Sequence, residues 1–125
     1  MHVNEVSGQI VDAAMCVHSA LGPGLLESAY QGCLVHELRK RGLEVRSREI
    51  LPVVYDGVTI DVGYRIDLEV AGSVIVELKA VEKLLPLHQA QLLSYLKLSG
   101  MRVGLLINFN VLHLRDGITR LVNRL

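Results

Sequence analysis

The chain has 125 residues, half of them hydrophobic and 21% charged, and its 13 basic and 13 acidic side chains give no net charge. This length fits one domain, residues 1–125, and the apolar content excludes a disordered chain. The neutral charge counts against a strongly basic nucleic-acid-binding domain. No apolar run reaches membrane-spanning length and no signal-peptide pattern is present, so we expect a cytoplasmic protein without a membrane part.

Two helices are predicted at the start of the chain. Apolar residues recur at helical spacing over residues 3–21, which predicts an amphipathic helix. A second helix is predicted over residues 26–41, after Gly22-Pro23-Gly24 and before Gly42. Its apolar side chains are expected to be buried, and these are Leu26, Ala29, Tyr30, Cys33, Leu34 and Leu38. Cys16 and Cys33 are expected to be free, buried thiols.

Glu27 falls in the first turn of the second helix, and two explanations for it stay open. A glutamate at a helix N-terminus offsets the helix dipole and needs no further role. Flanked by an apolar stripe, with Tyr30 one turn further along, Glu27 can also belong to a functional site. Tyr30 itself is expected to fill the core and not to bind substrate.

Strands are predicted over residues 45–55 and 59–70, joined by a turn at Asp56-Gly57, and over residues 74–79. Pro52 indicates that the first strand is an edge strand or is irregular there. Residues 102–108 form a nearly continuous apolar run, which is typical of a strand covered on both faces. A terminal hairpin is predicted from residues 111–115 and 118–122. Together these elements predict a mixed sheet with helices on both faces.

A third helix is predicted from Pro86 to Gly100. Four leucines along it are expected to supply core, and these are Leu92, Leu93, Leu96 and Leu98. Gln91 and Tyr95 form a separate polar stripe with His88 at helical spacing. His88 is expected to face solvent at the start of the helix.

The segment from residue 64 to residue 79 carries the main functional pattern. With alternating faces, Ile66, Leu68 and Val70 point one way and Asp67 the other. A three-residue turn at Ala71-Gly72-Ser73 then places Asp67 opposite Glu77, on the same face as Lys79.

Like charges placed opposite each other destabilise a sheet, so this pair of carboxylates calls for a cation. Lys79 supplies part of that charge, and a divalent metal would supply more. Oxygen-only ligands favour Mg²⁺ or Mn²⁺ over zinc. The alternative is a half-solvated strand that carries an ordinary Glu-x-Lys surface pair.

These motifs, in this order, resemble the PD-(D/E)XK nuclease superfamily. Asp67 matches its aspartate on the second strand, and Glu77-x-Lys79 matches the motif on the third strand. Gln91-x-x-x-Tyr95 resembles the RecB-like branch. Gly24-Leu-Leu-Glu27-Ser-Ala-Tyr30 resembles the motif of the small bacterial GxxExxY proteins. Ile66 stands where the superfamily's name has proline.

The resemblance implies a metal-dependent nuclease that hydrolyses phosphodiester bonds, in DNA in preference to RNA. The implied ligands of Mg²⁺ or Mn²⁺ are Glu27, Asp67, Glu77 and the carbonyl oxygen of Leu78. Lys79 would act on the attacking water or on the phosphate, and Gln91 and Tyr95 would position the nucleic-acid backbone or the lysine. The alternative is a catalytically idle subunit of the same fold that binds or regulates a partner.

Basic residues are dense over ten positions and comprise Arg39, Lys40, Arg41, Arg46 and Arg48. We expect nucleic-acid contact through this cluster, chiefly through Arg39, Arg41 and Arg46. The alternative is a solvated helix end, where basic side chains interact favourably with the helix dipole.

A homodimer is also predicted. The helix over residues 3–21 lies outside the matched nuclease core, and no strand face is assigned to it. Its apolar stripe is therefore expected to pack against a second copy. The alternative is that this helix covers the sheet within one chain.

Overall fold

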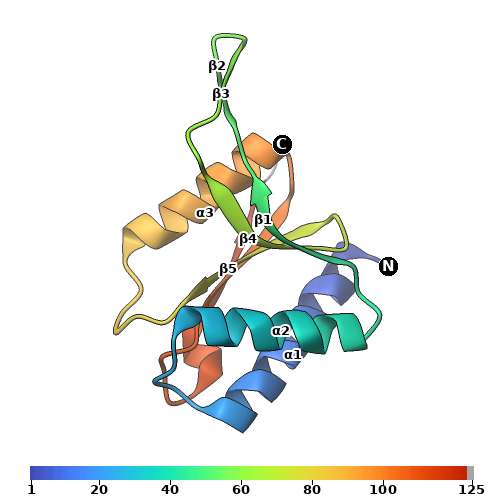
Figure 1. Cartoon of the computed structure of the whole chain (residues 1–125), viewed down its shortest axis with the longest axis vertical. Helices are drawn as coiled ribbons and strands as arrows, with labels where there is room; N and C mark the ends of the chain where they lie inside the picture. Colours follow the sequence, from blue (N-terminus) through green and yellow to red (C-terminus); the bar gives the residue numbers. More distant parts are fainter. Residues whose placement is uncertain (124–125) are drawn as a thin grey trace.

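The computed structural model describes residues 1–123, in which three α-helices flank a sheet (Figure 1). The helices are α1 (Val3–Leu21), α2 (Glu27–Lys40) and α3 (Pro86–Ser99). The strands are β1 (Val45–Ile50), β2 (Val53–Tyr55), β3 (Val58–Ile60), β4 (Arg65–Val70), β5 (Val74–Lys79), β6 (Val103–Asn108) and β7 (Ile118–Val122), and a 3-10 helix, η1 (Leu114–Gly117), precedes β7. In this part of the chain, no helix has the length and apolar character needed to cross a bilayer.

Five strands form the main sheet in the order β1-β4-β5-β6-β7, in which β5 and β6 are parallel and the other pairs antiparallel. Helices α1 and α2 cover one face, and α3 covers the other. This is the predicted mixed sheet with helices on both faces. The central strands β5 and β6 are buried almost throughout, because side chains from both helical layers cover them.

Helix α1 spans the predicted residues and packs on the sheet of its own chain. Val6, Ile10 and Val17 recur at helical spacing and are buried in one core cluster with Leu34 of α2 and Val76 of β5. The apolar stripe of α1 is therefore not free to pair with a second copy. The reason that the sequence suggested for a dimer does not hold.

The terminal hairpin is a wrong prediction, although its second strand, residues 118–122, is confirmed as β7. Residues 111–113 form a bend and not a strand, and β7 pairs with β6 across the intervening loop, with Leu105 opposite Arg120. The buried strand β6 has β5 on one side only, so its remaining backbone N–H and C=O groups need a partner on the other. The strand β7 provides that partner.

The long strands predicted over residues 45–55 and 59–70 are each interrupted. Backbone pairing between β1 and β4 stops near Ile50, and residues 51–52, including Pro52, separate β1 from β2. Beyond the break, β2 and β3 form a separate two-stranded sheet that projects from the body of the molecule (Figure 1). Asp56 and Gly57 both have positive φ, at 53° and 74°, as the predicted tight turn requires.

Helix α2 buries a narrower stripe than predicted, consisting of Tyr30, Leu34 and Leu38. Ala29 and Cys33 are exposed, because only the row of Tyr30, Leu34 and Leu38 faces the sheet. Leu26 is exposed because it is the N-cap, with extended backbone, and precedes the first helical turn. Both thiols were predicted to be buried and are exposed, although they are free as predicted.

Helix α3 also differs from its predicted pattern. Leu92 and Leu96 are buried as expected, but Leu98 is exposed and Tyr95 is buried with them. Tyr95 faces the sheet, and its ring belongs to the core. Gln91, one turn earlier on the helix, is exposed.

Candidate active site

The predicted opposition of Asp67 and Glu77 rests on the turn between β4 and β5. The three-residue loop places Val70 opposite Val74 and Leu68 opposite Val76. Ala71 and Gly72 have φ of 54° and 61°, so the loop depends on left-handed backbone that glycine adopts without strain. Asp67 and Glu77 are the next opposed residues, directly beyond the pair Leu68 and Val76.

At Asp67 and Glu77, hydrogen bonds to the two side chains take the place of backbone-to-backbone hydrogen bonds between the strands. The Asp67 N–H donates to Glu77 Oε1 at 3.1 Å, and the Leu78 N–H donates to Asp67 Oδ2 at 2.9 Å. Each carboxylate thus accepts a hydrogen bond from the opposite strand. The two strands open around this pair, and both carboxylates are held in place by backbone donors.

Ile66 does not lie on the predicted face. It is buried with Ile75 against α3, whereas Leu68 and Val70 face α1 and α2. The ladder between β1 and β4 lacks a pair at Arg48, whose φ is 59°. This irregularity lies opposite Asp67 and interrupts the regular alternation of β4 at the site.

Burial and like charge dominate the electrostatics of the site. Burial of Glu77, followed by the nearby negative charge of Asp67, raises the pKa of Glu77 from 4.5 to about 9. Partial burial, followed by Asp67, also raises the pKa of Glu27 at the start of α2. Lys79 acts in the opposite direction on both glutamates. Glu27 is therefore within electrostatic reach of the strand residues.

The donor chemistry of the strand pair fits a hard dication. Asp67 and Glu77 offer carboxylate oxygens side by side, and a cation would relieve the repulsion that raises the pKa of Glu77. Within residues 1–123, however, no three His, Cys, Asp or Glu side chains lie close enough together to hold a metal ion. The structure thus brings together Asp67 and Glu77, but not Glu27 as a third ligand. Mg²⁺ commonly binds one or two carboxylates and keeps several waters, so two carboxylates suffice.

Tyr95 and Gln91 of α3 lie on the same side of the sheet as Glu77. Burial of Tyr95, then the negative charge of Glu77, raises the pKa of its hydroxyl, and a hydrogen bond with Gln91 acts against this. Tyr64 stands beside Tyr95, with ring centroids 5.9 Å apart. A cavity of about 480 Å³ begins here and is lined by Tyr64, Leu87, His88, Ala90, Gln91, Ser94, Tyr95 and Leu98. The predicted Gln-x-x-x-Tyr pair therefore lines this cavity, and Tyr95 is within electrostatic reach of Glu77.

His88 is half-buried and not simply solvent-facing as expected. Its Nδ1 accepts the N–H of Leu85 at 3.0 Å, which satisfies a free donor at the start of α3.

Lys79 is also half-buried and follows Glu77 by two residues on β5, so the two share a face. Among the described residues Lys79 makes no ion pair, which leaves its ammonium available for a ligand.

The loop before Glu27 is held by Tyr30. The buried Tyr30 hydroxyl donates to the Gly22 carbonyl at 2.6 Å and accepts the Leu25 N–H at 3.1 Å. Its ring stacks on Phe109, with centroids 4.6 Å apart. Tyr30 fills the core as predicted, but its hydroxyl also fixes the loop that precedes Glu27.

Phe109 was missed by the sequence reasoning. It directly follows the buried strand β6 and is itself fully buried. An aromatic residue at the end of a covered strand was the available signal.

Gly24 takes a φ of 99°, a conformation that other residues rarely adopt. Gly24 and Tyr30 thus both shape the loop that precedes Glu27, and the three residues form one sequence unit, Gly24-x-x-Glu27-x-x-Tyr30.

Replacing Tyr30 by phenylalanine is expected to lower the free energy of unfolding by about 1–3 kcal/mol, because the buried Leu25–Gly22 bridge loses both hydrogen bonds. Cleavage activity, where the wild type shows it, should fall further than this stability loss explains, because Glu27 loses its support. Chemical denaturation and a metal-dependent cleavage assay measure the two effects. Tyr55→Phe, which removes an exposed hydroxyl, is the matched control. Unchanged stability in Tyr30→Phe would contradict the bridging role.

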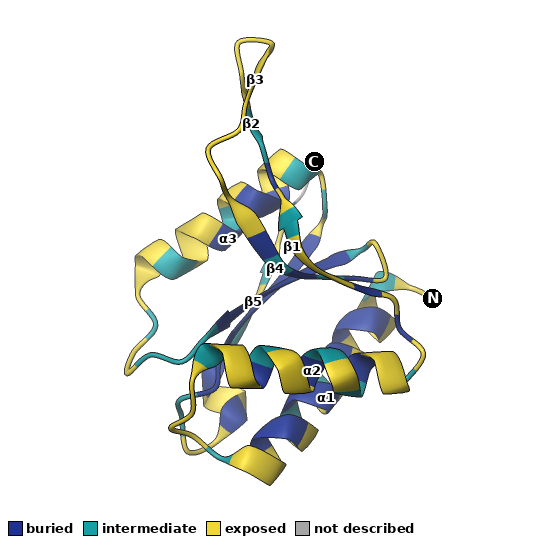
Figure 2. Ribbon diagram, in the orientation of Figure 1, coloured by how far each residue is buried: buried dark blue, intermediate teal, exposed yellow. Residues whose placement is uncertain are grey.

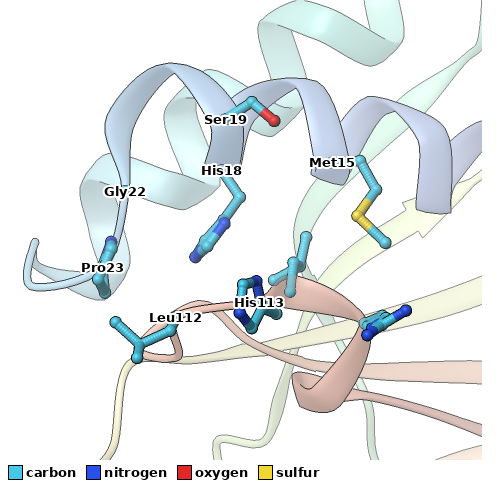
Figure 3. A pocket seen from close by; sticks show the side chains of 9 residues that line it. Met15, His18, Ser19, Gly22, Pro23, Leu112 and His113 are labelled. Carbon is cyan, nitrogen blue, oxygen red and sulfur yellow. The ribbon is translucent and has the colours of Figure 1, made fainter.

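A second cavity, of about 430 Å³, lies between α1 and the segment before β7 (Figure 3). Figure 3 shows His18 pointing from α1 toward the segment that carries Leu112 and His113. His18 Nε2 lies 2.8 Å from the Val111 carbonyl oxygen, so a protonated Nε2 donates to it. None of the predicted site residues lines this cavity. His18 therefore serves to attach the 111–115 segment to α1.

Arg39 and Arg41 of the basic cluster lie at the far end of α2 from Glu27. Arg46 and Arg48 lie instead on β1, where Arg46 is opposite Glu69 and Arg48 falls opposite Asp67. Helix α2 has 14 residues and is about 20 Å long, with Glu27 at one end and Arg39 near the other. Arg39 donates to the Val45 carbonyl at 2.9 Å. Arg41 pairs with Asp12 at 2.7 Å and with Glu37 at 3.2 Å. Hydrogen bonds with these two acids raise the pKa of Arg41, whose charge is thus engaged within the chain.

Comparison with known proteins adds one match. The search of curated proteins finds no match, and neither does the search of solved structures. The family model described as the PD-(D/E)XK nuclease superfamily matches residues 4–121. This range includes α1 and the strands that carry Asp67, Glu77 and Lys79. The chain belongs to the PD-(D/E)XK nuclease superfamily.

Proposed function

We propose that this protein is a metal-dependent nuclease that hydrolyses phosphodiester bonds in DNA. The observation that carries the proposal is the pair Asp67 and Glu77, held side by side by backbone donors where β4 and β5 separate. Lys79 lies on the same face with an unpaired ammonium among the described residues. The backbone N–H groups at this place need acceptors, but they do not require two acids beside a lysine, and the like charges disfavour that set.

In the proposed site, Asp67 and Glu77 hold Mg²⁺ or Mn²⁺, with Glu27 and the Leu78 carbonyl as further oxygen ligands. Such a metal lowers the pKa of a bound water and offsets charge on the phosphate under attack. To join them, Glu27 would have to move toward the strand carboxylates, because it is not clustered with them in the described residues.

The other residues act on the substrate. Lys79 orients the attacking water or stabilises charge on the phosphate, since its ammonium makes no ion pair among the described residues. Gln91 and Tyr95 position the nucleic-acid backbone at the mouth of the cavity along α3. The Gln91–Tyr95 pair supports a place in the RecB-like branch, and the Gly24–Glu27–Tyr30 unit supports a place among the GxxExxY proteins. Action in the cytoplasm is part of the proposal.

Nucleic-acid contact by Arg39, Arg41 and Arg46 stays a proposal with a smaller role. Arg41 is held by two acids, and Arg46 donates to Glu44 at 3.2 Å. A duplex spanning the site and the far end of α2 would have to cover about 20 Å. That is less than one turn of B-DNA, which is about 34 Å long, so Arg39 and Arg41 would contact phosphates away from the scissile bond.

Replacing Lys79 by alanine is expected to leave Mg²⁺ affinity within about twofold and to reduce turnover by about a hundredfold or more, the usual loss when one group that stabilises transition-state charge is removed. Lys79→Arg should also be slow, because a guanidinium cannot release a proton near neutral pH. Calorimetric titration with Mg²⁺ and a cleavage assay separate the two effects. Lys83→Ala, in the loop before α3, is the control. Full activity in Lys79→Ala would show that the assigned chemistry is wrong.

A second candidate function is a binding or regulatory subunit that keeps the fold and does not cleave. The absence of a three-ligand cluster among residues 1–123 and the neutral net charge favour it. Titration with Mg²⁺ or Mn²⁺, followed by cleavage assays on single-stranded and duplex DNA and RNA, discriminates the two. Metal binding with cleavage supports the nuclease, and metal binding without cleavage of any substrate supports the subunit.

A further inference from the structure

The hairpin that projects from the body of the molecule, here called the arm (residues 50–64), exposes many large apolar side chains. Seven of them are between 41% and 74% exposed, namely Ile50, Val54, Tyr55, Val58, Ile60, Val62 and Tyr64. Figure 2 shows the arm exposed along nearly its whole length. Monomeric proteins rarely expose a contiguous apolar surface of more than a few hundred Å². The arm therefore has the composition of a surface that another chain covers.

The structure of the arm supports the same conclusion. Its strands β2 and β3 have three residues each and pair only with one another in their sheet. Apolar side chains project from both faces, with Tyr55 opposite Val58 on one face and Val54 on the other. An isolated two-stranded hairpin is marginally stable in water. Its outer edges also leave backbone N–H and C=O groups unpaired.

The charges of the arm are self-complementary. The arm carries two exposed acids, Asp56 at the tip and Asp61 between tip and base, and two exposed arginines, Arg48 and Arg65, flank its base beside the half-buried Glu49. If two arms lie antiparallel about a two-fold axis, the acidic tip of each reaches the basic base of the other. A two-fold contact uses the same patch on both copies, so this separation of charge along the arm favours a second copy of the same chain.

We propose that this protein forms a two-fold dimer through its arms, packed side by side with the tip of each against the base of the other. A standard interface buries about 800 Å² on each partner, and the arm offers seven exposed large apolar residues toward such a contact. The dimer replaces the α1 contact suggested by the sequence, because α1 is covered by its own sheet. It goes beyond the proposed nuclease activity and does not depend on it.

Light scattering after size exclusion at micromolar concentration tests the dimer. The wild type should have twice the chain mass of 13.8 kDa. Tyr55→Ser combined with Ile60→Ser should raise the dimer dissociation constant by roughly thirtyfold or more, the effect of losing an interface hot spot. Both residues lie outside the two core clusters, so the helical circular dichroism should not change. Leu112→Ser, which removes an apolar side chain 82% exposed elsewhere, is the control and should remain a dimer.

A charge variant tests the tip-to-base arrangement. Arg65→Glu should weaken the dimer, because it places like charges against Asp56 of the second copy. Adding Asp56→Asn should restore much of the affinity, since it removes that repulsion and Asn-Gly is well suited to the turn. A wild-type monomer at all accessible concentrations would overturn the proposal. A dimer that is indifferent to both the arm substitutions and Arg65→Glu would overturn it too.

Discussion

Replacing Asp67 by asparagine is expected to abolish metal binding and to reduce cleavage by at least about a hundredfold. The reason is that Asp67 is one of only two carboxylates that the structure brings together at the opened strand pair. Asparagine keeps an oxygen that can accept the Leu78 N–H, so the fold should be retained. Calorimetric titration with Mg²⁺, a cleavage assay and thermal melts in chelator measure the three properties.

The alanine variant separates the electrostatic role of Asp67 from its structural role. Asp67→Ala also relieves the repulsion with Glu77, but it leaves the Leu78 N–H without its acceptor, which costs about 1–3 kcal/mol. We therefore expect Asp67→Asn to be the more stable of the two variants in chelator. Glu69→Gln, two residues further along β4, is the control and should bind metal normally. Metal-dependent cleavage by Asp67→Asn at the wild-type rate would contradict the assigned site.

Replacing Glu77 by glutamine is expected to stabilise the metal-free protein increasingly as the pH rises. Glu77 has a pKa of about 9 in the folded protein because it is buried beside Asp67, against an ordinary value of 4.5. Between these values the folded state binds more protons than the unfolded state, so the free energy of unfolding of the wild type falls with increasing pH. By pH 7 the difference reaches about 3 kcal/mol as an upper limit. Glutamine does not titrate and can still accept the Asp67 N–H.

Thermal melts in chelator from about pH 5 to about pH 9 measure this effect as the difference between Glu77→Gln and wild type. The difference cancels the titration of all other groups that the variant leaves unchanged. Excess Mg²⁺ should reverse the order of stability at high pH, because only the wild type binds the ion and gives up its proton to do so. A difference in melting temperature that does not vary with pH would contradict the burial and charge coupling of Glu77.

The sequence by itself determined the elements and the register of the site. Helical spacing located α1 at its observed ends, and the three-residue turn with Gly72 predicted Asp67 opposite Glu77. Both inferences depend on local rules, since helix and strand periods relate residues that are close in the chain. The residues needed for superfamily membership were therefore readable before the structure.

The tertiary structure decided which of these faces and ends were covered. Ile66 faces α3, Cys33 is exposed, and α1 covers the sheet of its own chain. The helix or strand period shows which residues share a face of an element. Whether that face is buried depends on partners that come from distant parts of the chain.

The same reason explains the contacts that no local pattern predicted. The Tyr30 hydroxyl bridges the loop before Glu27 while its ring stacks on Phe109, which lies 79 positions further along the chain. In the sequence, the arm has the pattern of two ordinary strands. In the assembled structure, β2 and β3 pair with each other and, among the described residues, with no strand of the main sheet. Long-range packing thus decided where the loop before Glu27 is held and which apolar surface stays exposed, because these depend on how the helices and sheet come together and not on any one segment.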